Sequence, residues 1–185
     1  MTIMKTIPAI IVVAVFGTLS IAHAATLEVD QERSRIHVDA KATGHAFTGT
    51  LKKYTTSVTG DASSLKPRGF DLKWSFKDLD TDDAKRDKKM IKWLGGGDPK
   101  GSFKFIKSWT DDKGNTKGMG TLTLNGVSKT VSFPFTVKKE GKWITIDGYA
   151  KIDYEDFKLS IIRTMVMLTV DPKLTVRFHV VGTIK

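Results

Sequence analysis

The sequence predicts an all-β protein, an up-and-down antiparallel barrel of about eight strands with one short helix. Two observations carry this prediction. Long segments alternate apolar and polar residues with a period of two, and short turn sequences join most of them. Sustained alternation indicates one buried and one solvated face, as in antiparallel sheet. Strands of this length with short connections favour a closed barrel over a sandwich.

The clearest alternation lies in four segments, residues 34–42, 69–77, 142–152 and 173–184. Two further strands meet at Asn125-Gly126, a pair that supplies the two positive φ values of a type I′ hairpin turn. Pro134 lies in the second of these strands and has no N–H to donate, so it predicts an edge or a bulge. Residues 47–58 add one or two weaker strands.

A strand with Phe103, Phe105 and Trp109 at alternating positions is expected before the Asn-Gly hairpin. Residues 156–164 are expected to hold a helical turn. These segments bring the expected number of strands to about eight or nine.

One segment departs from the alternation. Residues 82–94 contain many good helix formers, and Thr81 or Asp80 can cap the start of a helix there. Gly95-Gly-Gly97 with Pro99 would end it. The sequence therefore predicts one short helix at this place.

The first 24 residues have the organisation of a secretory signal peptide. Lys5 precedes an apolar run, and small residues ending in Ala22-His-Ala24 give an A-x-A cleavage signal. The alternative, a membrane anchor, needs about 20 apolar residues, and this run is shorter. We expect cleavage between Ala24 and Ala25, a single domain over residues 25–185 and a periplasmic location.

Composition excludes several classes of site. The chain of 185 residues has no cysteine, so it has no disulfide, thiolate metal site or cysteine nucleophile. Lys and Arg number 30 against 20 Asp and Glu, a formal charge of +10. A basic chain can bind nucleic acid, but the expected export and the lack of a stacking platform argue against that partner.

The inward faces of such a barrel would be apolar and rich in aromatic residues. The residues expected to line the interior are Val38, Phe70, Trp74, Phe76, Phe103, Phe105, Phe133, Phe135, Ile146 and Phe178. Eight strands enclose a space just wide enough for a small ligand, which here should be apolar and elongated. A filled core without a cavity remains the alternative, because the pattern alone cannot separate the two.

Several motifs resemble one family. The longest, Gly120-Thr-Leu-Thr-Leu-Asn-Gly-Val-Ser-Lys-Thr-Val131, is similar to the G-x-L-T-I-x-G-V-T-K-x-V hairpin of the YceI-like family. Other matches follow in family order: Asp30–Val38 for the first strand, Arg86-Asp87 for the helical segment, Pro99–Phe105, Asp156-Phe157 for a D-F-G-I motif, and 173–181 for the closing strand. The resemblance covers residues 27–185.

The resemblance implies a secreted, lipocalin-like barrel that binds a polyisoprenoid lipid without catalysis. The expected ligand is a polyprenyl phosphate or an isoprenoid quinone, held non-covalently, and no other cofactor is expected. The oligomeric state stays open. A rival interpretation is an envelope stress or interaction protein that has a filled core and acts through its basic surface.

The chain departs from the family pattern near the expected ligand entrance. Lys89 stands where the family has a histidine, and Gly95-Gly-Gly97 replaces an aromatic-rich stretch. Lys158 stands where the family has the glycine of D-F-G. These changes bear on the ligand's head group more than on the fold.

Four residues are candidates for contact with a head group or for the cavity rim: Arg86, Lys89, Arg163 and His45. Arg86 and Lys89 belong to a cluster of basic residues on the predicted helix. That cluster is either a solvated face, a cationic rim for a phosphate, or a surface for an anionic membrane.

The sequence shows no residue pattern typical of a catalytic site or a metal site. His37 and His179 fall on the polar faces of their strands without a ligand partner at suitable spacing. Asp80, Asp82 and Asp83 lack the glycine and distal glutamate of an EF-hand, so helix capping is the better interpretation. Ser, His and Asp occur without a local signature of nucleophilic catalysis, and we expect neither an enzyme nor a metal site.

Overall fold

The structure, a computed structural model, describes residues 24–164 and 168–185. The expected signal peptide, apart from Ala24, lies outside the described residues. The strands are β1 (Ala24–Val29), β2 (Arg35–Ala42), β3 (His45–Leu51), β4 (Thr55–Asp61), β5 (Pro67–Ser75), β6 (Leu79–Asp80), β7 (Lys100–Thr110), β8 (Thr116–Leu124), β9 (Val127–Glu140), β10 (Trp143–Asp153), β11 (Arg163–Thr164), β12 (Leu168–Thr169) and β13 (Lys173–Ile184). Helical segments are η1 (Phe76–Asp78), α1 (Ala84–Trp93) and η2 (Tyr154–Phe157).

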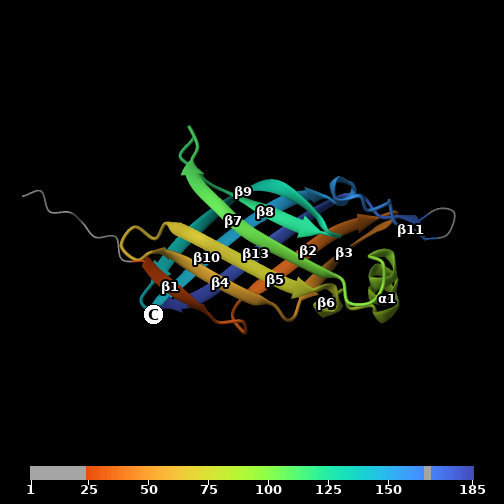
Figure 1. The fold of residues 1–185 in the computed structure, drawn as a ribbon, viewed down its shortest axis with the longest axis horizontal. Helices are drawn as coiled ribbons and strands as arrows, with labels where there is room; N and C mark the ends of the chain where they lie inside the picture. Colours follow the sequence, from red (N-terminus) through yellow and green to blue (C-terminus); the bar gives the residue numbers. More distant parts are fainter. Residues whose placement is uncertain (1–23, 165–167) are drawn as a thin grey trace, which may run out of the picture.

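Eight of the described strands close into an antiparallel ring in the order β1-β4-β5-β7-β8-β9-β10-β13, and β13 returns to β1. Along one side β13 pairs with β10, and along the other it pairs first with β2 and then with β1. β2 and β3 therefore extend the wall beyond β1 towards α1 (Figure 1). This confirms the predicted up-and-down barrel.

The Asn-Gly turn forms as predicted, and Pro134 lies at a different kind of position from the expected one. Asn125 and Gly126 have φ values of 50° and 70°, as a type I′ turn requires, and they join β8 to β9. Pro134 is neither on an edge strand nor at a bulge. It lies where β9 stops pairing with β8 and begins to pair with β10, a place where a missing N–H interrupts neither ladder.

The predicted helix forms as α1, but its cap differs from the expected one. The Asp83 carboxylate accepts hydrogen bonds from the backbone N–H groups of Lys85 and Arg86, at 2.9 and 3.0 Å. Neither Thr81 nor Asp80 fills this role, because the helix begins two residues later than the composition suggests. The helical turn expected over 156–164 forms earlier, as η2.

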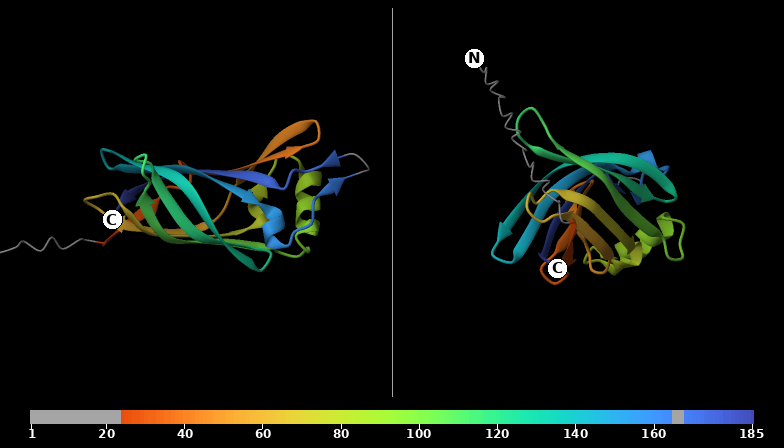
Figure 2. Two further views of the ribbon diagram at one scale, coloured as in Figure 1. Left: turned by 90° about the horizontal axis from the view of Figure 1, so that it is seen from above. Right: turned by 60° about the vertical axis from the view of Figure 1, so that its left-hand side comes forward.

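α1 and η2 lie at one end of the elongated barrel, and β1 with the chain's C-terminus lies at the other (Figures 1 and 2). At the second end, Leu27, Val58 and Ile144 form a buried cluster with neighbouring apolar side chains. Such packing closes that end of the interior. No helix of the described ranges is long and apolar enough to cross a bilayer.

Several carboxylates at the protein surface and at the cavity mouth have lowered pKa values. The Arg177 guanidinium donates to both oxygens of Asp39, which lowers the pKa of that carboxyl. Bonds from Ser63 and Ser64 hold the pKa of Asp61 far below its usual value, and the backbone N–H of Arg86 lowers that of Asp83.

We therefore expect stability to depend on pH in the acid range. A carboxyl with a lowered folded-state pKa stabilises the protein above its unfolded-state pKa, and this contribution is lost as the pH falls through the folded-state value. The free energy of unfolding should stay level down to about pH 4 and fall below it. Thermal unfolding followed by circular dichroism across this range checks the expectation, and a midpoint that stays constant into strong acid would contradict it.

Candidate functional site

The barrel encloses a cavity of about 530 Å³ with a predominantly apolar wall. The structure places all ten residues expected to face the interior on this wall: Val38, Phe70, Trp74, Phe76, Phe103, Phe105, Phe133, Phe135, Ile146 and Phe178. The filled-core alternative is therefore not what the structure shows. Sequence reasoning missed further lining residues at the same alternating positions, among them Ile36, Ala40, Leu122, Val131, Ala150, Ile152, Val176 and Val180.

The interior stays hollow because large rings lie against the wall. Trp74 pairs across the strands with Gly101, where a β-carbon would come within 2.2 Å of Trp74 Cζ2. Phe178 pairs with Gly148 in the same way, and a β-carbon on Gly148 would come within 2.3 Å of Phe178 Cζ. Each glycine lets the opposite ring lie flat over the backbone, so the centre of the barrel is left open.

Aromatic contacts make the wall continuous. The centroid of the Phe133 ring lies 5.7 Å from that of Phe103, 5.6 Å from that of Phe178 and 6.1 Å from that of Phe135. Phe103 in turn lies 5.9 Å from Phe70. Tilted and edge-to-face pairs of this kind are favourable beyond simple burial. They line the interior with an apolar surface suited to a hydrocarbon chain.

Polar lining residues gather where α1 and β3 meet, which places the mouth of the cavity at that end. Lys85, Arg86 and Lys89 of α1 and His45 of β3 all line it, together with Asp83. The three basic helix residues outnumber the one carboxylate, so the mouth is positive. Of the four predicted rim residues, three lie here.

Arg163 is different from the other three candidates. It lies on β11, is exposed, and does not line the cavity. Lys85 belongs to the basic cluster expected on the helix but was not among the four candidates, and the structure places it at the mouth. Its position four residues before Lys89 on the same helix was the available signal, because such residues share a face.

Hydrogen bonds and a cation–π contact hold the Arg86 side chain in place. Its Nε donates to Thr81 Oγ1 at 2.8 Å, and its Nη2 donates to the Thr81 carbonyl. The guanidinium carbon lies 4.2 Å from the centroid of the Phe47 ring, a cation–π contact between α1 and β3. Thr81 Oγ1 donates to Asp87 Oδ1 at 2.6 Å. Arg86 therefore fixes the helix across the mouth, and Lys85 and Lys89 are the other two cations that line it.

Next to the mouth, α1 is anchored to the η2 segment. Trp93 Nε1 donates to the Ser160 carbonyl at 2.8 Å, and the Trp93 ring meets Tyr154 edge-on at 5.1 Å. The Tyr154 hydroxyl donates to the Val170 carbonyl at 2.8 Å and accepts from Ile162 N. Burial raises the pKa of Tyr154, so the phenol stays neutral and keeps this donor.

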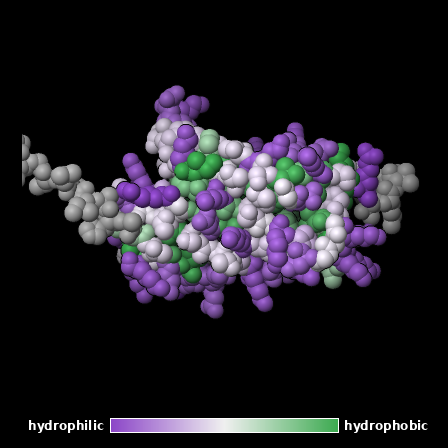
Figure 3. Space-filling view, viewed as in Figure 1, coloured by the Kyte–Doolittle hydropathy of each residue, from purple (hydrophilic) through white to green (hydrophobic). Residues whose placement is uncertain are grey.

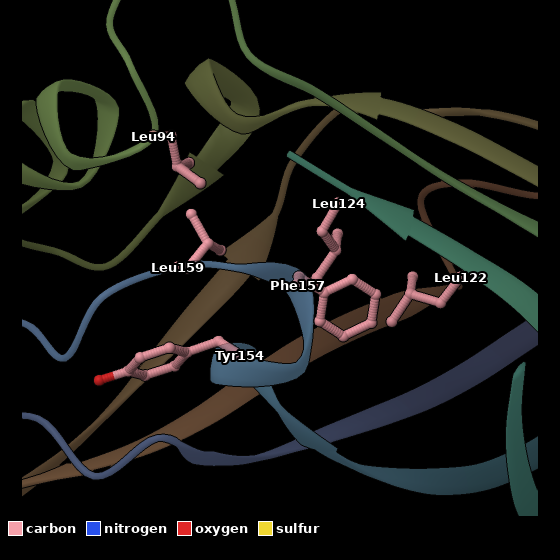
Figure 4. Packing of buried hydrophobic residues seen from close by; sticks show 6 residues of the cluster. All are labelled: Leu94, Leu122, Leu124, Tyr154, Phe157 and Leu159. Carbon is pink, nitrogen blue, oxygen red and sulfur yellow. The ribbon is translucent and has the colours of Figure 1, made fainter. Parts of the chain in front are cut away.

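Beneath these contacts lies a cluster that contains two of the most deeply buried side chains of the described residues. Phe157 is 1% exposed and Tyr154 is 2% exposed. Figure 4 shows Phe157 between Leu122 and Leu124 of β8, with Leu94 and Leu159 nearby. This buried cluster, residues 94, 122, 124, 154, 157 and 159, closes part of the barrel end beside the mouth.

Lys158 follows this cluster in the left-handed conformation, with φ 58° and ψ 28°. Because that conformation costs an L-residue about 1–2 kcal/mol, we expect Lys158→Gly to raise the free energy of unfolding by about 0.5–1 kcal/mol after the backbone entropy of glycine is deducted. Denaturant unfolding measures the change. Lys151→Gly, at an exposed strand position, is the control and should lower stability. If both changes have the same sign, the backbone conformation is not the cause.

Two histidines of the barrel strands each have a single polar partner. His37 Nδ1 lies 3.1 Å from Thr50 Oγ1, and His179 Nδ1 lies 2.6 Å from Asp147 Oδ1 on the outer surface. Within residues 24–164 and 168–185, no three His, Asp or Glu side chains converge to hold a metal ion. The arrangement is suited to binding an apolar ligand with a polar end.

Comparisons with known proteins agree with this architecture. The model of the YceI-like domain matches residues 27–182. The chain belongs to the YceI-like family. No curated protein matches it significantly by sequence. YceI-like barrels are binding proteins, and family and fold together support a lipid-binding barrel in general.

Solved structures that are similar to this YceI-like chain include those of two bacterial proteins. BcnA of Burkholderia cenocepacia is 20% identical, with a TM-score of 0.71 over 84% of this chain and 100% of that protein. The Campylobacter jejuni YceI protein is 22% identical, with a TM-score of 0.60 over 74% of this chain and 84% of that one. At these identities the likeness shows the fold.

Proposed function

We propose that this protein is a periplasmic, non-catalytic carrier of a long isoprenoid lipid, either a polyprenyl phosphate or an isoprenoid quinone. The observation that carries the proposal is the cavity of about 530 Å³, which is apolar along its length and positive at its mouth. An apolar chain would enter the barrel, and its polar end would remain near α1. The periplasmic location rests on the signal-peptide pattern of the first 24 residues.

The cavity volume limits how much of the chain is enclosed. An apolar cavity of about 150 Å³ holds one benzene, or about 25 Å³ for each carbon, so a cavity of about 530 Å³ holds a chain of about 20 carbons. A lipid of three or four isoprene units would fit inside, and a longer one would extend past the mouth. Burial of each methylene contributes about 0.8 kcal/mol before the chain's ordering is deducted, which is sufficient for a lipid to stay bound through purification.

The decisive experiment is native purification of the exported protein, extraction with organic solvent and mass spectrometry of the extract. A stoichiometric isoprenoid species is the expected result. An empty extract, repeated after polyprenyl phosphate and quinone have been offered to the protein, would refute the carrier function. Sequencing the exported N-terminus tests the cleavage site between Ala24 and Ala25 in the same preparation.

The positive mouth favours a phosphate over a quinone head group. We expect the double change Lys85→Glu, Lys89→Glu to weaken binding of a polyprenyl phosphate about tenfold or more at low salt and to leave binding of the neutral prenol of equal length unchanged. Fluorescence titration measures both affinities.

The matched control is Lys88→Glu, Lys92→Glu, which changes the same charges on exposed α1 positions that do not line the cavity. An equal loss in the control, or an equal loss for phosphate and prenol, would show that the mouth cations do not contact the head group.

A further inference from the structure

Two of the three large apolar side chains that are strongly exposed in the described chain lie on one hairpin. Ile106 is 51% exposed and Trp109 is 38% exposed, and both belong to β7. The β7–β8 hairpin projects from the barrel wall (Figure 1). On the face seen in Figure 3, a hydrophobic patch lies on this hairpin beneath a hydrophilic tip. A tryptophan and an isoleucine exposed on one hairpin form the kind of apolar surface that marks an interaction site.

The exposure follows from a bulge in β7. The pairing passes from Phe105 with Gly120 to Lys107 with Met119, so Ile106 is an extra residue. Phe105 lines the cavity and faces inward. Beyond the bulge the alternation is shifted by one residue, which turns Lys107 and Trp109 outward.

The register shows which side chains share the outward face. Directly opposite residues of an antiparallel pair lie on the same face, and Lys107 pairs with Met119 while Trp109 pairs with Lys117. Gly118, on the other face of β8, is buried against Phe133. Ile106, Lys107, Trp109, Lys117 and Met119 thus share one outward face that is basic and apolar, which we call the hairpin patch; Ile106, Lys107 and Trp109 are exposed on it, and Lys117 and Met119 are half-buried.

The acidic residues of this hairpin lie elsewhere. Asp111 is in the turn, where its carboxylate accepts from Lys113 N at 3.0 Å and from Asn115 N at 2.8 Å. Lys117 Nζ lies 3.7 Å from the same carboxylate. Asp112 belongs to the turn as well. Lys117 is thus paired at the edge of the patch with a carboxylate of the turn, and the outward face combines the charge of Lys107 with apolar side chains.

We propose that the hairpin patch docks the protein on the surface of an anionic phospholipid bilayer. Lys107 and Lys117 would meet lipid phosphates, and each lysine near an anionic surface adds to binding. Trp109 suits the interface between headgroups and acyl chains, because its ring is apolar and its N–H is polar. Ile106 and Met119 would bury apolar area beside it.

Docking through this patch leaves the cavity mouth uncovered. The hairpin tip and α1 lie at different ends of the barrel in both Figure 1 and Figure 2. Membrane binding is therefore assigned to a different surface from the basic face of α1, and it does not depend on what the cavity holds.

The test is co-sedimentation of the purified protein with vesicles of phosphatidylglycerol and phosphatidylethanolamine, compared with vesicles of phosphatidylcholine. Binding to the anionic vesicles alone is expected. The variant Lys107→Glu, Lys117→Glu should lose about tenfold or more of this affinity, and Ile106→Ser, Trp109→Ser should lose a similar amount. The emission of Trp109 should shift to the blue on binding, a shift that Trp109→Phe removes.

Two control variants distinguish the patch from other surfaces. Lys88→Glu, Lys92→Glu removes equal charge from α1, and Tyr149→Ser removes the third strongly exposed apolar side chain, which is 46% exposed on β10. Both should bind vesicles like the wild type. Equal binding to phosphatidylcholine, undiminished binding by both hairpin variants, or a larger loss in a control would overturn the proposal. Lipid extraction from the same variants reports separately on the carrier function.

Discussion

The variant Ala150→Trp is expected to emerge from native purification without its lipid. Ala150 lies on β10, is buried, and faces the cavity opposite Val176. An indole at this position would occupy space that a ligand chain needs, in the middle of the apolar wall. We expect the amount of extracted isoprenoid per protein to fall about tenfold or more. Mass spectrometry of the solvent extract measures it.

The neighbouring change Lys151→Trp is the matched control. Successive residues of a strand point to opposite faces, and Lys151 is exposed. The same side chain on the outer face should leave ligand occupancy unchanged. Circular dichroism checks that both variants fold, and Val38→Trp fills the cavity from another strand if Ala150→Trp does not. Full occupancy in the folded cavity variants would place the ligand elsewhere and contradict the carrier proposal.

Much of this fold could be predicted because its determinants are local in sequence. Alternation places Phe103 and Phe178 on inward faces regardless of which strands they pair with. Asn125-Gly126 specifies its turn through two φ values alone. The outward direction of Trp109 could not be predicted, because it depends on a single extra residue in the strand. Trp109 shares its alternation with Phe103 in the sequence, and only the bulge at Ile106 reverses it.

Whether the barrel is hollow depends on pairing between distant strands. The sequence alone does not show that Gly101 pairs with Trp74 or that Gly148 pairs with Phe178. Only these pairings explain why glycine is needed at the two positions. For the same reason the sequence could not separate a lined cavity from a filled core. The role of Arg86 was likewise hidden, since its contact with Phe47 joins residues 39 positions apart.

Phe157→Ala is expected to have the largest effect on stability. Phe157 is 1% exposed within the buried cluster of Leu94, Leu122, Leu124, Tyr154 and Leu159 (Figure 4). Truncation there removes buried apolar area and leaves a void that a closely packed cluster cannot fill. The free energy of unfolding should fall by about 3–5 kcal/mol, and the thermal midpoint by on the order of 10 °C for a chain of this length.

Phe105→Ala provides the comparison, because it makes the same chemical change at a residue that faces the open cavity. Its removal enlarges an existing space instead of creating a new one, so its cost should be smaller. Both variants must be compared in delipidated protein, since a ligand that binds only the folded state adds its own stabilisation. Equal losses at the two positions would mean that the middle of the barrel is packed as tightly as its end, and would contradict the hollow interior on which the carrier proposal rests.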